Sequence, residues 1–371
     1  MAEVVEPNLS LNLNQFFQKH ILLNDLQYDY YSKYLAAACK SQGGSEVVIL
    51  TKEGSLLNVL SYFNTDYEAV FVSWAPPTLA AHSGYGASHT SSNDNMLVVV
   101  TTENALCMYR NSSDCVGAWD LVFRSTEFSK SVSCLATTGV PGRTGGNVDN
   151  LLVALGSHLG VVTVVPLNTL SLPKHSVNHR ENTPLENHSV SGSVETLSAH
   201  NGGVTAMAFS SPDSMSGSRL MLATGGLDNT VKLWEYEENF ALKKVLKLVP
   251  NGETHTTYLG ERAGDAESRR ALKRVSSLAF SKRGELAAAT DGSVYIFANA
   301  HEWVLFQVLI VGTSHQERSA ACPSGAAERH GERGVVLSFS NDKLVVMRDT
   351  ESYVLKRSDK GIFEAESKLE R

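Results

Sequence analysis

A short pattern of apolar residues recurs along this chain, and it constrains the fold more than any other feature. The pattern is an apolar residue, two variable residues, a second apolar residue, one variable residue and a residue that is usually bulky. Its last two positions lie two residues apart and therefore share one face of a strand, as a half-buried strand requires. The copies are Leu23/Leu26/Tyr28, Ala69/Val72/Trp74, Val132/Leu135/Thr137, Val204/Met207/Phe209 and Val275/Leu278/Phe280.

Two further apolar runs follow each copy, and each of these runs predicts another short strand. The second runs are Leu35–Ala38, Met96–Val100, Leu151–Leu155, Leu220–Thr224 and Leu286–Ala289, and the third runs are Val47–Leu50, Leu106–Tyr109, Val162–Val165, Val231–Trp234 and Val294–Phe297. Three units add a fourth strand that opens on an aromatic residue, at Trp119–Phe123, Phe240–Leu246 and Trp303–Leu309. Four antiparallel strands per unit, repeated around a ring, indicate an all-β propeller.

The predicted propeller is a single domain over residues 1–371, with six blades whose cores lie between about residues 20 and 350. Val335–Phe339 and Leu344–Met347 are predicted as the second and third strands of the last blade, and residues 351–371 as a charged C-terminal tail. Units recur every ~45 to 70 residues, more than the ~40–45 of common blades. The surplus lies in polar segments that are expected as exposed loops, at 80–95, 139–150, 166–195, 250–272 and 312–333.

The charge and the cysteines exclude several classes of protein. The chain has 32 lysines and arginines against 39 aspartates and glutamates, a formal net charge of −7, and no basic run stands out. We therefore expect no direct nucleic-acid binding and no polybasic membrane anchor. The five cysteines contain no CxxC pair, which indicates a reducing compartment and argues against a disulfide scaffold or a zinc site.

Membrane insertion and secretion are not expected either. The first residues, Met1–Glu6, are acidic where a secretory signal needs positive charge. Leu151–Leu167 carries no charge, but a turn bounded by Gly156 and Gly160 interrupts it. Two β-branched runs around such a turn indicate a hairpin, so we expect a soluble protein that faces the cytosol.

No set of residues predicts catalysis, a cofactor or a metal ion. His175, His179 and His188 share one polar segment, but no cysteine or carboxylate completes a ligand set there. Gly142–Gly146 lacks the lysine and the strand-to-helix context of a phosphate-binding loop. We therefore expect no catalytic, cofactor-binding or metal-binding residue, and no enzyme activity.

The clearest copy of the repeat is Val204–Leu248. His200 precedes its first strand, Thr224 lies on the second, Asp228 is in the next turn, and Trp234 ends the third. These residue types at these places resemble a blade of the WD-repeat proteins. The resemblance implies that His200, Thr224, Asp228 and Trp234 form a buried, hydrogen-bonded structural network.

A more specific resemblance comes from the order of several motifs. They are Asn24–Tyr31, Ser73–Pro76, Ala199-His200 and Gly225–Trp234, together with the fourth strands that open on tryptophan. In this order they are similar to the Sec-thirteen family, the small WD-repeat subunit of the COPII outer coat that is shared with the outer-ring scaffold of the nuclear pore. The similarity covers the blade cores and excludes the loops, which are longer than is usual in that family.

This resemblance implies a function and a partner. The six-bladed ring would be open, and a large α-solenoid coat protein or nucleoporin would complete it by inserting strands of its own, so that unpaired sheet edges gain partners. The protein would be a scaffold subunit of a hetero-oligomeric cage or ring in ER-to-Golgi vesicle transport, in nuclear pore and mRNA transport, or in both. It would lie at the cytoplasmic face of the ER and of COPII vesicles and at the nuclear envelope, peripheral to the membrane through the coat. The implied partner-binding residues at the edges of the first and last blades are Leu23, Leu26, Tyr28, Val335, Leu337 and Leu344.

Three alternatives remain open. A WD-repeat substrate receptor of a ubiquitin ligase often carries Trp-Asp-x-Arg, whereas Trp234–Glu237 lacks the arginine. A phosphoinositide-binding propeller needs Phe-Arg-Arg-Gly, which Phe123–Thr126 does not provide. The N-terminal segment Asn8–Phe17 is a rival to the partner, because it could close the ring as an outer strand.

Overall fold

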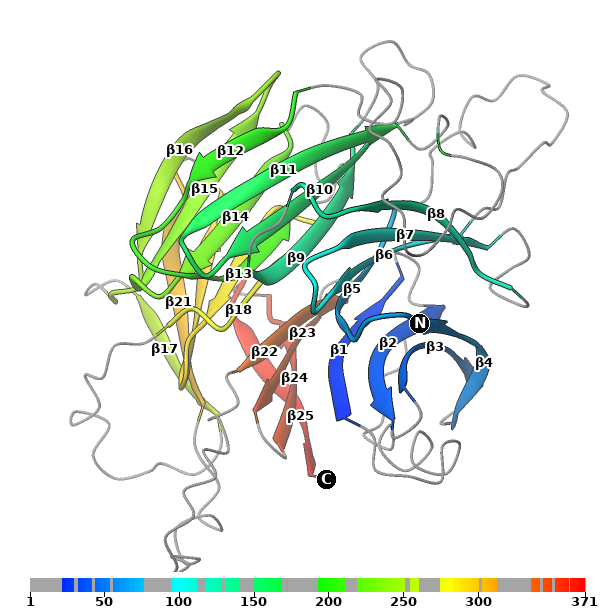
Figure 1. The fold of residues 1–371 in the computed structure, drawn as a ribbon. Helices are drawn as coiled ribbons and strands as arrows, with labels where there is room; N and C mark the ends of the chain where they lie inside the picture. Colours follow the sequence, from blue (N-terminus) through cyan, green and yellow to red (C-terminus); the bar gives the residue numbers. More distant parts are fainter. Residues whose placement is uncertain are drawn as a thin grey trace, which may run out of the picture. The chain divides into compact units, whose positions relative to one another are not determined.

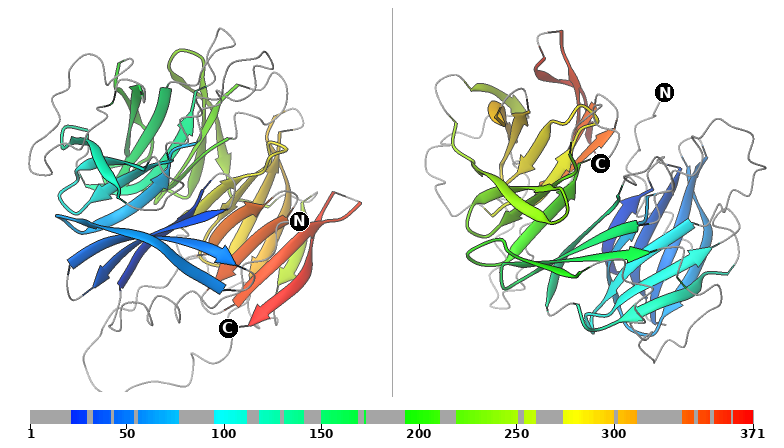
Figure 2. Two further views of the ribbon diagram at one scale, coloured as in Figure 1. Left: turned by 90° about the vertical axis from the view of Figure 1, so that its right-hand side faces the viewer. Right: turned by 90° about the horizontal axis from the view of Figure 1, so that it is seen from above.

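A computed structural model describes eighteen stretches of the chain, which contain strands and turns and are drawn in colour in Figures 1 and 2. The described residues are 22–29, 33–41, 44–53, 56–76, 95–111, 118–128, 131–140, 150–168, 172, 193–210, 219–250, 254–259, 274–299, 302–311, 335–340, 343–348, 351–359 and 361–370. They form two compact units, one within Glu3–Ser198 and one within Ala199–Arg371. Among the described residues there is no helix with the length and apolar character needed to cross a membrane.

The first unit holds three four-stranded antiparallel sheets, and each is built from consecutive strands. The first sheet contains β1 (Leu22–Tyr28), β2 (Tyr34–Ser41), β3 (Gly44–Glu53) and β4 (Leu56–Thr65). The second contains β5 (Ala69–Trp74), β6 (Asn95–Thr101), β7 (Leu106–Asn111) and β8 (Asp120–Ser125). The third contains β9 (Val132–Gly139), β10 (Asn150–Ser157), β11 (Val161–Asn168) and β12 (Glu195–Ser198).

The second unit also holds three sheets. One contains β13 (Val204–Phe209), β14 (Met221–Gly226), β15 (Thr230–Tyr236) and β16 (Phe240–Lys247). The next has five strands in the order β17-β21-β20-β19-β18, from β17 (His255–Leu259), β18 (Ser277–Phe280), β19 (Leu286–Ala289), β20 (Ser293–Ala298) and β21 (Val304–Val311). The last contains β22 (Val336–Ser340), β23 (Lys343–Arg348), β24 (Glu351–Arg357) and β25 (Phe363–Glu370).

The predicted fold class is confirmed, since the described residues form repeated antiparallel sheets without helices. The end of the chain differs from the expectation. Val335–Phe339 and Leu344–Met347 lie at the first and second strands of the last sheet, where the second and third were predicted. Residues 351–371, expected as a charged tail, contain β24 and β25, because the apolar run of Tyr353, Val354 and Leu355 is buried in the last sheet.

An added strand is the other difference. β17 lies inside the segment 250–272, which was expected as a loop, and it pairs in parallel with the outer strand β21. His255-Thr256-Thr257-Tyr258-Leu259 has no clear apolar alternation, so the sequence alone does not indicate this strand. It forms because the edge of β21 offers unpaired backbone groups.

The cores lie between neighbouring sheets of each unit. Successive residues of a strand point to opposite faces, so Ala36 and Ala38 of β2 face a cluster shared with the second sheet, while Leu35 and Ala37 face the other side. In that shared cluster Phe63 packs against Tyr109, with ring centroids 4.3 Å apart. Such dense apolar packing is the main source of stability in sheets of this kind.

Polar side chains also connect neighbouring sheets. In the first unit, Trp74 Nε1 donates to the Gln27 carbonyl at 3.0 Å, and the Val72 N–H donates to Asp25 Oδ2 at 2.9 Å. In the second unit, the fully buried Gln307 accepts from the Phe363 N–H and donates to the Phe363 carbonyl, both at 2.8 Å. The side-chain amide of Gln307 therefore makes the same pair of hydrogen bonds with Phe363 that a backbone amide makes in a β-sheet. These bonds join β21 to β25 in the next sheet.

Candidate functional site

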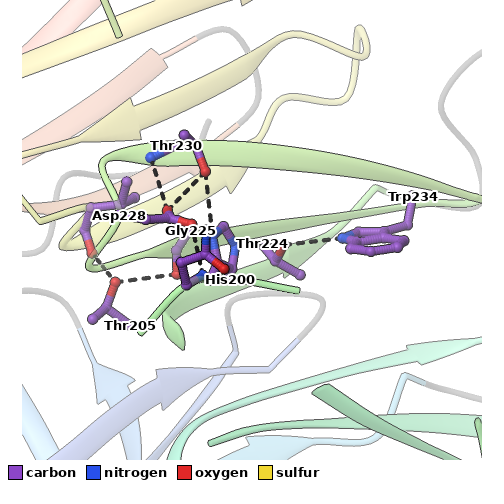
Figure 3. Close-up of polar contacts among 9 residues, drawn as sticks. His200, Thr205, Thr224, Gly225, Asp228, Thr230 and Trp234 are labelled. Carbon is purple, nitrogen blue, oxygen red and sulfur yellow. Dashed lines mark hydrogen bonds and ion pairs between the residues drawn. The ribbon is translucent and has the colours of Figure 1, made fainter. Parts of the chain in front are cut away.

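The turn between β14 and β15 belongs to a connected set of polar contacts (Figure 3). Asp228 Oδ1 accepts from the Thr230 N–H at 3.2 Å and from the Thr230 hydroxyl at 2.8 Å. Asn229 has a φ of 66°, a left-handed conformation that asparagine tolerates better than most residues. The sequence Asp-Asn-Thr therefore makes a tight turn that holds the Asp228 carboxylate in place.

His200 extends this turn into a chain of hydrogen bonds. Its Nδ1 lies 2.9 Å from Asp228 Oδ1, and its Nε2 lies 3.0 Å from Thr224 Oγ1. The indole N–H of Trp234 donates to the same Thr224 hydroxyl at 3.0 Å. The structure thus brings together the four residues that the WD resemblance implied, from the segment before β13 to the third strand of the sheet (Figure 3).

One arrangement of protons satisfies every member of this chain. Trp234 has only a donor, so the Thr224 hydroxyl accepts from it and donates its own proton to His200 Nε2. The other ring nitrogen, Nδ1, then carries the proton and donates to the Asp228 carboxylate. This arrangement requires a neutral imidazole and an ionised carboxylate.

The pKa directions agree with that assignment. Burial lowers the pKa of His200 below its ordinary value, and the charge of Lys232 acts in the same direction, whereas Asp228 partly opposes both. Burial tends to raise the pKa of Asp228, but hydrogen bonds from Thr230, His200 and the Asn201 N–H outweigh it, so this pKa is lowered. His200 is therefore neutral and Asp228 charged near neutral pH.

The two glycines before the turn are required by close contacts. A Cβ on Gly226 would lie 2.5 Å from Cγ of the His200 ring, and a Cβ on Gly225 would lie 2.4 Å from Cγ1 of Val275. Any side chain at these positions would displace the histidine or the neighbouring sheet. Sequence reasoning included Gly225 and Gly226 only as part of a resemblance, and it did not single out Thr230. The spacing of an aspartate two residues before a threonine is the signal that indicates such a turn.

The hydrogen-bonded residues from Trp234 to Asp228 stabilise the fold. The hydroxyl of Thr224 is buried and already accepts one hydrogen bond and donates another, so it cannot act as a nucleophile without breaking the chain. Within the described stretches, no group of three His, Cys, Asp or Glu residues could hold a metal ion. His175, His179 and His188 lie outside the described residues.

The expected partner-binding residues are not equally accessible. Leu26 is 37% exposed and Tyr28 is half-buried, and Leu23 lies on β1 but its side chain is outside the described set. In contrast, three of the residues are buried in the core between the β17–β21 sheet and the last sheet: Val335, Leu337 and Leu344. These three side chains cannot contact a partner unless that core opens, so a partner at this edge would have to pair with backbone groups.

Arg124 is the only arginine of Phe123–Thr126, the segment that was compared with a phosphoinositide-binding loop. It is 7% exposed, its Nη2 lies 3.6 Å from Glu103 Oε2, and its guanidinium lies 6.0 Å from the ring of Tyr67. This cation is therefore largely buried, and a carboxylate and an aromatic ring of the same chain already lie beside it.

Comparisons with known proteins agree with this geometry. Residues 191–235, which contain the hydrogen-bonded chain, match the family described as WD domain, G-beta repeat. The structure of Sqt1 from Saccharomyces cerevisiae is similar, with a TM-score of 0.53 and 11% identity, over 94% of this chain and 73% of that chain. The β-propeller domain of Cps50 (Swd1) from Myceliophteria thermophila matches with a TM-score of 0.46 and 12% identity, over 88% of this chain and 80% of that chain.

Among curated proteins, none matches this sequence. At 11% identity the likeness to Sqt1 concerns the fold alone. The repeated sheets, the chain of hydrogen bonds from Trp234 to Asp228 and the match at residues 191–235 together show that this protein has the WD-repeat β-propeller fold.

Proposed function

We propose that this protein is a non-enzymatic scaffold subunit that binds a large α-solenoid partner, in the COPII vesicle coat, in the outer ring of the nuclear pore, or in both. The proposal rests on the resemblance of the motif order to the Sec-thirteen family and on one topological observation. Among the described residues, every sheet consists of consecutive strands that belong to a single unit.

This topology has a physical consequence for how a propeller is held together. A ring closed by its own chain is held most firmly when strands from both ends of the chain share one sheet, since backbone hydrogen bonds then join the ends. Here the first sheet takes all of its described strands from β1–β4 and the last from β22–β25. A partner that inserts its own strands would supply backbone pairing of the kind that the described strands of the two ends do not make with each other, which supports the proposed mode of assembly.

Side-chain hydrogen bonds hold the first strand, β1, in place. The polar side chains of β1 bond to β5, because Asn24 Nδ2 donates to the Ala69 carbonyl at 2.8 Å and Asp25 accepts from the Val72 N–H. These bonds tie β1 to β5 of the second sheet through side chains, without strand pairing on the side of β1 that faces away from β2. Partner binding would then add contacts without first breaking those that hold β1.

Affinity purification of the tagged full-length chain from its native cells tests the proposal. We expect a large α-solenoid protein to copurify in stoichiometric amount and to be identified by mass spectrometry. Leu159→Ser serves as a control, because Leu159 is 73% exposed at a turn of the first unit and its change should leave the complex intact. Recovery of ubiquitin-ligase subunits in place of a solenoid would refute the proposal.

A further inference from the structure

The strand β17 is added to the outer strand of a complete four-stranded sheet. It pairs with β21 in parallel, from His255 opposite Gln307 to Leu259 opposite Val311, whereas β20 pairs with the other side of β21 in the antiparallel sense (Figure 1). In the part of the chain that the structure describes, the outer strands of the other five sheets carry no such addition. The edge of β21 therefore holds a strand where the others hold none.

Gln307 on β21 provides a polar anchor for the added strand. Its side chain is fully buried, its Oε1 accepts from the Phe363 N–H, and its Nε2 donates to the Phe363 carbonyl. An amide nitrogen has two hydrogens, and the second is donated to Thr257 Oγ1 of β17 at 3.0 Å. The bonds to Phe363 do not depend on β17. They therefore hold the amide in position, with one donor directed at whatever strand lies along β21.

An apolar contact lies two residues further along the added strand. Thr257 and Leu259 share one face of β17, because successive strand residues alternate between faces. Leu259 is 3% exposed and belongs to the core cluster that β21 shares with the last sheet. The edge of β21 thus makes two side-chain contacts with a parallel strand, one with a hydroxyl and one, two positions later, with a large aliphatic side chain.

β17 itself is held by few contacts. Leu259 is its only buried residue, Thr257 is half-buried, and the other three side chains are exposed. By contrast, β20 on the other side of β21 is buried over most of its length. Strands that bury little surface open locally at a lower free energy than core strands, and parallel pairing is slightly weaker than antiparallel pairing. These differences indicate that β17 separates from β21 more readily than β20 does.

We propose that the edge of β21 is a docking site for an extended segment of a partner protein, and that β17 is the chain's own competitor for this site. The segment lies parallel to β21, with a serine or threonine hydroxyl at Gln307 and a leucine-like side chain in the place of Leu259. Backbone pairing provides most of the affinity, and these two side chains select the sequence. β17 weakens the apparent affinity, because the site must open before the segment binds.

The tether of β17 argues for a partner protein over a second copy of this chain. A second copy would offer the identical strand, and the strand already attached to the same chain competes at a much higher effective concentration. A partner segment with a better fit to the edge does not have this disadvantage. The site uses neither β1 nor β22, so it is independent of the proposed solenoid partner.

Fluorescence anisotropy with the full-length protein tests the proposal. The probe is a labelled peptide with the sequence of residues 252–261, which contains β17. The Leu259→Ser protein should bind this peptide at least about tenfold more tightly than the unchanged protein, because its own β17 loses the buried side chain and competes less. The Thr256→Ala protein is the matched control. Thr256 is an exposed residue of the same strand, so this protein should bind like the unchanged one.

Peptide variants test how the edge selects its sequence. With the Leu259→Ser protein, a peptide that carries Thr257→Val should bind about fivefold more weakly, because valine has the shape of threonine but no acceptor for the Gln307 amide. A peptide that carries Thr256→Val should bind like the parent peptide, since this side chain is exposed.

Circular dichroism checks that each protein variant is folded. If Leu259→Ser does not fold, the milder Thr257→Ala protein takes its place and should bind the peptide about threefold more tightly than the unchanged protein. Equal binding by the unchanged and the loosened protein would overturn the proposal, and so would equal binding of the Thr257→Val and Thr256→Val peptides. A dimer of the unchanged protein in sedimentation that Leu259→Ser abolishes would also overturn it, because the occupant would then be β17 of a second copy.

Discussion

Arg357 Nη1 lies 2.7 Å from Glu285 Oε1, and this ion pair connects the end of β24 to the residue that precedes β19 in the neighbouring sheet. The Glu285 side chain is 7% exposed and that of Arg357 is 28% exposed, so the carboxylate depends on its partner more than the guanidinium does. Glu285 Oε2 also accepts from the Ser281 hydroxyl at 3.2 Å. A buried carboxylate is thus stabilised from two sheets of the same unit.

The first prediction follows from this asymmetry. Arg357→Leu should lower the free energy of unfolding by about 2 kcal/mol, because it leaves the buried Glu285 carboxylate without its cation. Adding Glu285→Gln should recover part of that loss, since a neutral amide costs less to bury. Urea unfolding of both single variants and the double variant measures the coupling, and additive losses would show that the pair does not interact.

The second prediction concerns Trp234. Trp234→Ala should lower the stability by ~3–5 kcal/mol, because a buried indole leaves a cavity and its N–H no longer satisfies Thr224. Trp234→Phe keeps most of the volume and removes only the donor, so about 1 kcal/mol should be lost. Thermal unfolding of the alanine variant within a degree or two of the unchanged protein would contradict this role.

The third prediction is a dependence of stability on pH. The pKa of His200 is lower in the folded than in the unfolded protein, where it is about 6.5, so the unfolded state binds a proton first as the pH falls. Stability should therefore be fully present above about pH 6.5 and should decrease below it. The lowered pKa of Asp228 acts in the same direction below about pH 4.

Unfolding free energies measured between neutral and weakly acidic pH check this sign. His200→Gln should be less stable at neutral pH, because it breaks the chain to Asp228 and Thr224. Its stability should also change less between about pH 6.5 and pH 5, since the titrating group is gone. An identical slope in both proteins would assign the effect to another group.

The fourth prediction compares the deletion of a polar segment, residues 174–192, with a substitution of the buried residue Leu172 that precedes it. Residues 174–192 lie outside the described residues, and their polar sequence predicts a loop. Deleting them should change the stability by less than about 1 kcal/mol, because the entropy of closing a connection depends only weakly on its length. Leu172 must be kept, since it is 3% exposed in the core of the first unit. Leu172→Ala should cost about 2–3 kcal/mol. If the deletion unfolded the protein, the segment would be a structural element.

The fifth prediction tests binding through backbone groups at the last sheet. Val336 is 49% exposed and lies opposite Met347 in the ladder of β22 and β23. The backbone N–H of Leu337 points away from β23 and donates to Ser277 Oγ at 3.2 Å. Leu337→Pro removes this edge-facing donor and should abolish capture of the solenoid partner, whereas Val336→Ala and Leu26→Ala should reduce it at most about twofold. Circular dichroism at the temperature of the binding experiment establishes that the proline variant is folded. Normal capture by that variant would exclude β22 as a pairing edge.

The strands were predictable where apolar residues alternate with polar ones. Val231 and Leu233 point to one face of β15 and are fully buried, so the alternation of apolar residues in the sequence correctly predicts which face of the strand is buried. β17 was not predictable in this way, because an edge strand buries little of its surface. Of its five residues only Leu259 is buried, and what holds the strand is the edge of β21 together with the amide of Gln307.

The sequence alone determined the type of fold, because the spacing of short apolar runs and the turn Asp228-Asn229 act through local backbone geometry. It also indicated that His200, Thr224, Asp228 and Trp234 act as a group, because their order along the chain resembles a WD repeat. Tertiary structure was needed to show which apolar residues remain accessible. Val335 and Leu242 both belong to apolar strand sequences, yet Val335 is fully buried and Leu242 is half exposed. The difference arises because a neighbouring sheet packs on Val335, whereas Leu242 lies on an outer strand that no other described strand covers. Local pattern specifies which face of a strand is apolar, and only packing between sheets specifies whether that face is covered.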